Sequence, residues 1–255
     1  MLRLLPERLY AGLFGEHAWL GRGATSELAP VQLPPQTSSK PSEMLEALLQ
    51  AAPPRRRAAK LSVMLPSLAV RCVSLPWSPG IHGAEEKQAY ALAHLEQAGL
   101  STDDMHVVHA EFRHFGARGL AYAVPRQLLD ELHAVAARYS LDLTTALPIG
   151  GVAYLAARRA RGAGGELTLV LEENAVSALL MDCVGLQRFD AEPAVGGYRQ
   201  ALRRLLTRLA SDSTEFKGIT LCADAEDKEL AGIAGAFATP VSVRQIKSPQ
   251  WRRFL

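Results

Sequence analysis

Cysteine is scarce in this chain. Among its 255 residues only Cys72, Cys183 and Cys222 occur, far apart in the sequence and without a Cys-x-x-Cys pair. An odd and sparse count excludes a disulfide scaffold and is typical of a reducing compartment. An excess of one charge is also missing, because 28 Lys and Arg residues face 26 Asp and Glu residues. A net charge of +2 is too small for a dedicated nucleic-acid binder.

Long hydrophobic runs are absent as well. The longest uncharged stretch, residues 143–157, has 15 residues and contains Pro148, Gly150 and Gly151. A membrane-spanning helix needs ~20 apolar residues, so the sequence predicts none. Residues 1–6 lack the apolar core and the small-residue cleavage site of a signal peptide. We therefore expect a soluble, cytosolic protein.

What the chain does have is the composition of an ordinary globular protein. Apolar residues make up 48% and charged residues 21%, which excludes a disordered or low-complexity chain. The length corresponds to one or two domains. Its best boundary is the glycine-rich stretch at residues 161–165.

Strand-like and helix-like patterns alternate along the chain, which favours the α/β class. Before residue 161 we expect strands at residues 9–14, 17–22, 61–65, 68–75, 106–115, 120–124 and 141–147, and helices at 42–52, 83–98, from Pro125 onward, and 151–160. After it we expect strands at residues 166–171, 175–183, 186–190, 218–222 and 241–246, and helices at 197–210 and 228–237. Each half opens with an antiparallel pair or meander and ends in β/α units, so the two halves suggest an actin-like ATPase architecture.

One stretch resembles a known family. Residues 61–77, LSVMLPSLAVRCVSLPW, are similar to the segment of PilM-like and GspL-like proteins in which two strands end in Leu-Pro steps. Residues 9–14 resemble the first strand of that family. The helix led by Pro125 and the strand ending at Pro148 follow in the expected order. Arg188, followed by Gly196 and Gly197, resembles the Arg-then-Gly-Gly element of the same family.

The resemblance implies an α/β, actin-like (ASKHA) fold of two lobes, with mixed β-sheets flanked by helices and an inserted subdomain like that of FtsA. The first lobe would span residues 1–160, with its main subdomain at residues 7–67 and 117–160 and the insertion at 68–116. A second, reduced lobe would follow at residues 161–255.

The same resemblance implies a function. PilM-like and GspL-like proteins are cytoplasmic scaffolds on the inner membrane of type IV pilus or type II secretion assembly machines. They hold the cytoplasmic tail of a bitopic membrane partner, PilN in the pilus case, and connect it to the assembly ATPase. In the family this tail lies between the first subdomain and the inserted one. We therefore expect Arg71, Leu75, Pro76 and Trp77 to bind a partner.

The phosphate-binding pattern of actin-like ATPases is degraded here. The family holds phosphates with two hairpin turns, each with glycine for backbone approach and an Asp that organises Mg²⁺. The first turn reads GLFGE at residues 12–16, with Leu13 or Phe14 in place of the Asp. The second reads EENA at residues 172–175, where adjacent carboxylates would repel a triphosphate. No adenosine-binding Gly-Gly is recognisable, so we expect no cofactor and no catalysis.

Other candidate sites are weaker. His106, His109 and His114 could suggest metal ligands, but alternation on a strand separates the first two. Arginines at positions 199, 203, 204 and 208 line one side of a predicted helix. They form either a solvated face or a contact for anionic lipid headgroups or an acidic partner. Residues 2–6, LRLLP, resemble the tail motif that partners of this family present, and self-association or a disordered terminus are the two interpretations.

The sequence thus predicts a non-enzymatic actin-like scaffold at the cytosolic face of the bacterial inner membrane. The alternative is an ATPase or sugar-kinase-like enzyme with an unusual phosphate site. A third interpretation is a generic α/β interaction domain. The absence of an Asp in the first hairpin argues against the enzyme.

Overall fold

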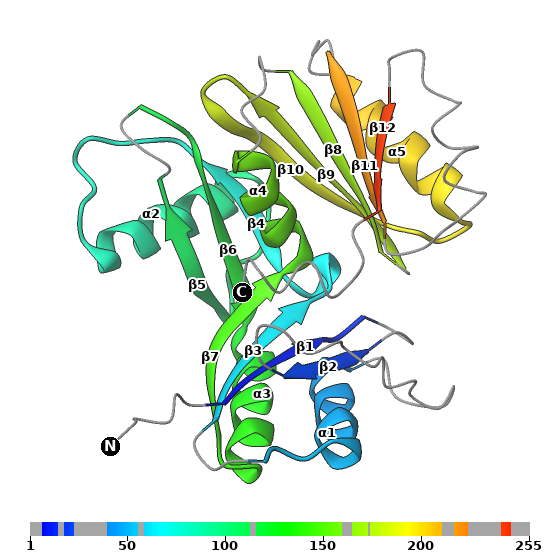
Figure 1. Ribbon diagram of the computed structural model, residues 1–255. Helices are drawn as coiled ribbons and strands as arrows, with labels where there is room; N and C mark the ends of the chain where they lie inside the picture. The colour runs from blue at the N-terminus through cyan, green and yellow to red at the C-terminus, as the bar shows by residue number, and fades with distance from the viewer. Residues whose placement is uncertain are drawn as a thin grey trace.

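The computed structural model contains three β-sheets, each with helices packed against it (Figure 1). It describes residues 7–14, 18–22, 40–55, 59–112, 116–159, 165–172, 174–210, 217–223 and 241–245. The predicted helix at residues 228–237 and the predicted self-association segment at residues 2–6 lie outside this part of the chain.

The first sheet has the strand order β2-β1-β3-β7. Its members are β1 (Arg8–Gly12), β2 (Trp19–Arg22), β3 (Ala59–Leu65) and β7 (Leu141–Pro148). β1 and β2 form the expected antiparallel hairpin, and β3 and β7 add in parallel. The nearly continuous apolar run of β3 is typical of a parallel strand covered on both faces.

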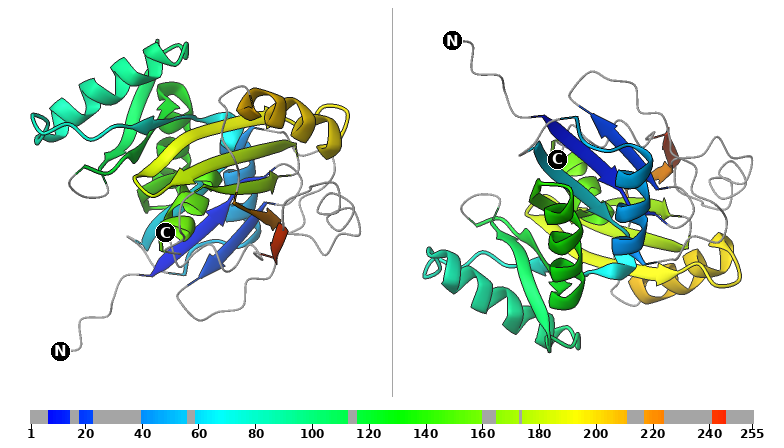
Figure 2. Two further views of the ribbon diagram at one scale, coloured as in Figure 1. Left: turned by 90° about the horizontal axis from the view of Figure 1, so that it is seen from above. Right: turned by 90° about the horizontal axis from the view of Figure 1, so that it is seen from below.

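Two helices cover one face of this sheet, α1 (Pro41–Ala51) and α3 (Arg126–Arg138), and they lie side by side when seen from below (Figure 2). Met44, Leu45, Leu48 and Leu49 form the buried stripe of α1 at helical spacing. Pro125 ends the preceding strand and caps α3, so the helix begins one residue later than the sequence predicts.

The second sheet is the insertion, with the order β4-β6-β5. Its strands are β4 (Arg71–Leu75), β5 (Met105–Glu111) and β6 (Gly119–Pro125), and helix α2 (Ala84–Gln97) covers one face. A short 3-10 helix, η1 (Ser67–Ala69), leads into it from the end of β3. We expected the insertion to end at residue 116. Because β6 pairs with β4 and β5, the inserted sheet continues to Pro125.

The third sheet has five strands in the order β10-β9-β8-β11-β12. These are β8 (Glu166–Glu172), β9 (Ala175–Asp182), β10 (Gly185–Pro193), β11 (Gly218–Ala223) and β12 (Val241–Gln245). The first three form an antiparallel meander, and β11 and β12 add in parallel. Helix α5 (Tyr198–Ala210) buries Ala201, Leu202, Leu205 and Leu209 against this sheet.

The first and third sheets repeat one arrangement. In each, a hairpin is joined by two parallel strands on the side of its first strand, so β2-β1-β3-β7 corresponds to β9-β8-β11-β12. Helix α4 (Ile149–Arg159) connects the two lobes and packs on β7, β8 and β9 (Figure 1). The largest core cluster contains residues from all three sheets, among them Leu61, Tyr122 and Leu179. The lobes and the insertion therefore share one core.

Candidate functional site

A buried carboxylate joins the two lobes. Glu172 ends β8 in the second lobe, and only 5% of the residue is exposed. One carboxylate oxygen accepts the backbone N–H of Ser67, the first residue of η1, at 2.8 Å. The other accepts the hydroxyl of Ser177 on β9 at 2.9 Å. The hairpin of the second lobe is thereby fixed to the segment that follows β3 in the first.

Glu172 is buried, and its hydrogen-bond partners Ser67 and Ser177 are neutral. Burial raises the pKa of its carboxyl above the ordinary value of 4.5, although the hydrogen bonds from Ser67 and Ser177 act in the opposite direction. Burial also raises the pKa of the nearby Cys72 thiol, and the charge of Glu172 adds to this rise. Cys72 is therefore a buried thiol of low reactivity rather than a nucleophile.

This geometry changes the interpretation of the second hairpin. The sequence suggested that Glu172 and Glu173 are adjacent carboxylates that would repel a triphosphate at this turn. Glu172 instead turns inward to Ser67 and Ser177, because the buried N–H at the start of η1 needs an acceptor. Glu173 lies outside the described residues.

The first hairpin is packed with apolar side chains. Leu13 is fully buried, and its N–H donates to the carbonyl of Met64 at 3.0 Å. Trp19 and Phe14 lie directly over Gly12, so that a methyl group on Gly12 would come within 2.2 Å of the Trp19 indole nitrogen. Glycine at this position accommodates an aromatic ring.

An open groove lies beside the lobe junction and shares Ser67 with it, with a volume of about 630 Å³. It runs between the inserted sheet and the second lobe. Its walls are β4, β10, η1, the end of α2 and the loop that follows α2. The lining residues are Ser67, Leu68, Val70, Arg71, Cys72, Val73, Ser74, Pro76, His94, Gln97, Ala98, Leu100, Arg118, Gln187, Arg188, Phe189, Asp190 and Ala191.

Contacts of β10 with the insertion and with α4 bound the groove. At one end the Ser74 hydroxyl donates to the carbonyl of Leu186. There the N–H of Arg118 also donates to the carbonyl of Val184 at 3.0 Å. Toward the other end the Phe189 ring packs on Gly150 of α4, where a methyl group would come within 2.3 Å of the ring. The groove is therefore a built feature of the fold.

The lining of the groove is cationic, but most of its charges are already paired. Arg118 forms an ion pair with Asp182, and Arg188 forms one with Asp190 at 2.7 Å. Burial lowers the pKa of His94, which favours its neutral form. Arg71 is exposed, and among the described residues its guanidinium donates only to the Val70 carbonyl at 3.4 Å. Arg71 is thus the cation that remains available to a ligand.

The structure separates the four predicted partner-binding residues. Arg71 and Pro76 line the groove. Leu75 is fully buried between β4 and α2, because alternate residues of β4 point toward that helix, so its side chain offers no surface to a partner. Trp77 is half-buried and follows β4 without lining the groove. The wall formed by β10 was not predicted from the sequence.

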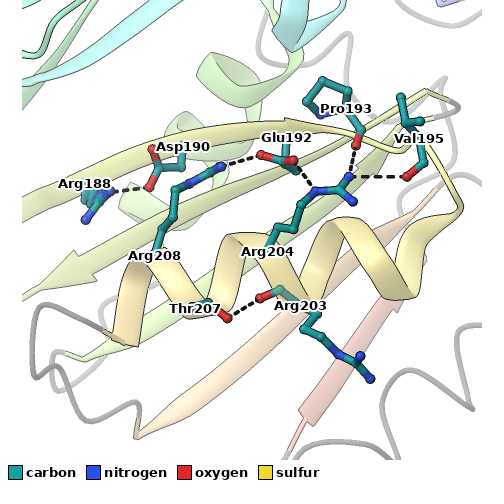
Figure 3. A network of polar contacts seen from close by, with 9 residues as sticks. All are labelled: Arg188, Asp190, Glu192, Pro193, Val195, Arg203, Arg204, Thr207 and Arg208. Carbon is teal, nitrogen blue, oxygen red and sulfur yellow. Dashed lines mark hydrogen bonds and ion pairs between the residues drawn. The ribbon is translucent and has the colours of Figure 1, made fainter.

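The arginines of α5 are mostly occupied within the protein. Arg204 and Arg208 both bind the Glu192 carboxylate of β10, and Arg204 also donates to the carbonyls of Pro193 and Val195 (Figure 3). Arg203 points away from this network (Figure 3). Two of the four arginines, Arg204 and Arg208, therefore hold α5 against β10, which leaves fewer cations on this helix face for lipid or an acidic partner.

The histidines of β5 form no metal cluster within the described residues. His109 stacks on Tyr122 of β6 at 5.4 Å and lies 3.6 Å from the Glu111 carboxylate. A β-bulge between Val107 and His109 changes the alternation that the sequence argument assumed. His114 lies outside the described part of the chain.

Comparison with solved structures places this arrangement among known folds. A Bacteroides thetaiotaomicron protein with an actin-like ATPase fold and unknown function is similar at a TM-score of 0.62 and 9% identity, covering 93% of this chain and 90% of that one. A chain of the PilM-PilN type IV pilus biogenesis complex is similar at a TM-score of 0.62 and 13% identity, covering 97% and 94%. The chain has the actin-like ATPase fold.

This finding confirms the fold class and the resemblance at the level of architecture. Models of known families and curated proteins give no match to the sequence. In this chain the first hairpin carries the buried Leu13, and the second carries Glu172, which contacts Ser67 of the other lobe. None of the described helices is long and apolar enough to cross a bilayer.

Proposed function

We propose that this chain is a PilM-like scaffold of a type IV pilus or type II secretion machine. In this role it binds the cytoplasmic tail of a PilN-like bitopic membrane protein at the cytosolic face of the inner membrane. The single observation that carries the proposal is the groove between the inserted sheet and the second lobe. This groove differs from the place that the family resemblance implies for the tail, between the first subdomain and the insertion. The likeness of the whole chain to a PilM-PilN structure supports it. The groove is bounded by contacts of β10 and is lined by Arg71, which forms no ion pair with a described residue.

We propose further that the role is not enzymatic. Leu13, buried in the first hairpin, cannot position Mg²⁺ as a carboxylate does. In the second hairpin the Glu172 carboxylate is occupied by Ser67 and Ser177. Both features support an adaptor whose lobes are joined by its own side chains in place of a nucleotide.

The partner test is co-purification of this chain with the PilN-like membrane protein of the same organism, followed by titration of that protein's cytoplasmic tail as a synthetic peptide. Arg71→Glu reverses the charge at the groove, and we expect it to weaken binding about tenfold or more. Arg203→Glu is the matched control, since Arg203 is an arginine on α5 outside the Glu192 network (Figure 3). Equal losses in the two variants, or no binding by the native chain, would contradict the proposal.

The nucleotide test is calorimetric titration with Mg-ATP. We expect no stoichiometric heat at micromolar affinity. A clear one-to-one signal would favour the ATP-binding alternative instead.

A further variant, Trp77→Ala, tests whether the partner surface extends beyond the groove. If it weakens binding of the tail peptide by about 1 kcal/mol or more, Trp77 belongs to that surface.

A further inference from the structure

The groove runs along the edge of β4. Side chains of successive strand residues point to opposite faces of a sheet. Yet four consecutive residues of β4, Arg71 to Ser74, line the groove. A cavity on one face of the sheet would touch only alternate residues. The groove is therefore open to the backbone of β4 from the side.

The second lobe presents a strand edge in the same way. Five consecutive residues of β10, Gln187 to Ala191, line the opposite wall. Both strands end the order of their sheets, β4-β6-β5 and β10-β9-β8-β11-β12. Among the described strands, β4 pairs only with β6 and β10 pairs only with β9.

The two edges run in opposite directions. Arg118 forms an isolated parallel bridge with Gly185, so β6 and β10 start in the same direction, and β4 is antiparallel to β6. Near this end a side-chain bond from Ser74 to the carbonyl of Leu186 links the strands. Beyond it the edges separate and leave the groove between them.

We propose that the groove receives its ligand as an additional β-strand, paired through main-chain hydrogen bonds to the free edge of β4. The ligand is an extended peptide segment of a partner protein, about four or five residues long at the usual rise per strand residue. This inference rests on the proposed function and specifies how the partner tail binds.

The chemistry of the groove supports an extended peptide as its occupant. A strand edge displays N–H and C=O groups in a regular row, and only another backbone in extended form matches that row. The walls offer apolar contacts from Val73, Leu100 and Phe189 to the side chains of such a strand. Arg71 at the groove is available to a carboxylate or carbonyl of the same segment.

The test uses the synthetic cytoplasmic tail of the PilN-like protein, with single N-methyl amides placed at successive positions. N-methylation removes one backbone donor without changing the side chain. We expect a loss of about tenfold in affinity at every second position of the bound segment and less than about twofold at the positions between. Uniform losses, or none, would overturn strand addition to β4.

Amide hydrogen exchange of the full chain supplies a second measurement. We expect binding of the same peptide to slow exchange within residues 71–75 of β4. The matched control is β5, the opposite edge of the same three-stranded sheet, whose exchange should stay unchanged. Protection of β5, or of neither strand, would also overturn the inference.

The two failures can be told apart. If the unmodified peptide does not bind at all, the proposed function fails and the mode of binding fails with it. If it binds without the two-residue period and without protection of β4, the scaffold function stands and strand addition is wrong.

Discussion

Two glutamates of the second lobe, Glu172 on β8 and Glu192 on β10, are both largely covered yet differ in their environment. Glu172 accepts hydrogen bonds from a backbone N–H and a hydroxyl, both of them neutral donors. Glu192, whose side chain is 12% exposed, forms ion pairs with two guanidinium groups (Figure 3). Burial acts to raise the pKa of each carboxyl. At Glu172 this effect dominates and the pKa is raised, whereas at Glu192 the hydrogen bonds from Arg204 and Arg208 outweigh burial and the pKa is lowered.

The different environments of Glu172 and Glu192 show two ways in which elements of this fold are held together. At the lobe junction, Glu172 forms no ion pair with a described residue. Away from the junction, the arginines of α5 are used to bind the helix to β10. Among the described residues, charge-assisted hydrogen bonds therefore hold α5 to β10, while neutral donors hold Glu172 at the junction.

The largest expected effect is at Glu172. Replacing it with Ala leaves the Ser67 N–H and the Ser177 hydroxyl without their acceptor inside the core and also creates a cavity. We expect the free energy of unfolding to fall by about 2–4 kcal/mol in urea denaturation. Ser177→Ala, which removes one donor and leaves the acceptor in place, should cost about 1 kcal/mol. An Ala variant as stable as the native chain would show that Glu172 does not join the lobes.

The next effect is at Glu192. Glu192→Ala removes the shared acceptor of Arg204 and Arg208, both of which remain about 40% exposed and can be hydrated. We therefore expect a loss of roughly 1 kcal/mol, smaller than at Glu172. High salt should reduce the difference between this variant and the native chain, whereas it should leave the Glu172 difference unchanged.

The pH dependence should have opposite signs at the two sites. The pKa of Glu172 is raised in the folded state, so its contribution is complete below the ordinary value of 4.5 and is lost as the pH rises through the folded pKa. The pKa of Glu192 is lowered, so its contribution is complete above 4.5 and is lost as the pH falls through the folded pKa.

Replacing each glutamate with the uncharged glutamine isolates its contribution to the pH dependence of the unfolding free energy. Relative to Glu172→Gln, the native chain should become less stable as the pH rises above 4.5. Relative to Glu192→Gln, it should become less stable as the pH falls below 4.5. Unfolding curves at a series of pH values measure both, and slopes of the same sign would show that the arginines do not control Glu192.

Much of the fold could be predicted from local sequence patterns, while the junction could not. The apolar run of β3 and the helical spacing in α1 and α5 are local, and they give the order of elements correctly. The partner of Glu172 is 105 residues away, and the bond from Ser74 to Leu186 spans 112 residues. No periodicity records such distances, so the sequence predicted neither the contact of Glu172 with Ser67 nor β10 as a wall of the groove.

The strand β6 shows the same limit at smaller scale. The sequence predicts a strand at residues 120–124 and its pairing with the strand at 106–115, but not that it also pairs with β4. The arginines of α5 are a further case. Their spacing predicts a cationic face, while the acceptor that occupies two of them comes from the preceding strand through a loop with Gly196 and Gly197 in the left-handed region.

The smallest expected effect tests that last distinction on neighbouring residues of one helix. Arg204→Ala removes bonds to Glu192, Pro193 and Val195 and should cost about 1 kcal/mol of unfolding free energy. Arg203→Ala removes a side chain that points away from the network (Figure 3) and should change it by less than about 0.5 kcal/mol. Both variants lose one positive charge, so the general effect of net charge cancels in the comparison. Equal losses would mean that the helix needs arginine for its charge alone, and the Glu192 contacts would then not be what binds α5 to β10.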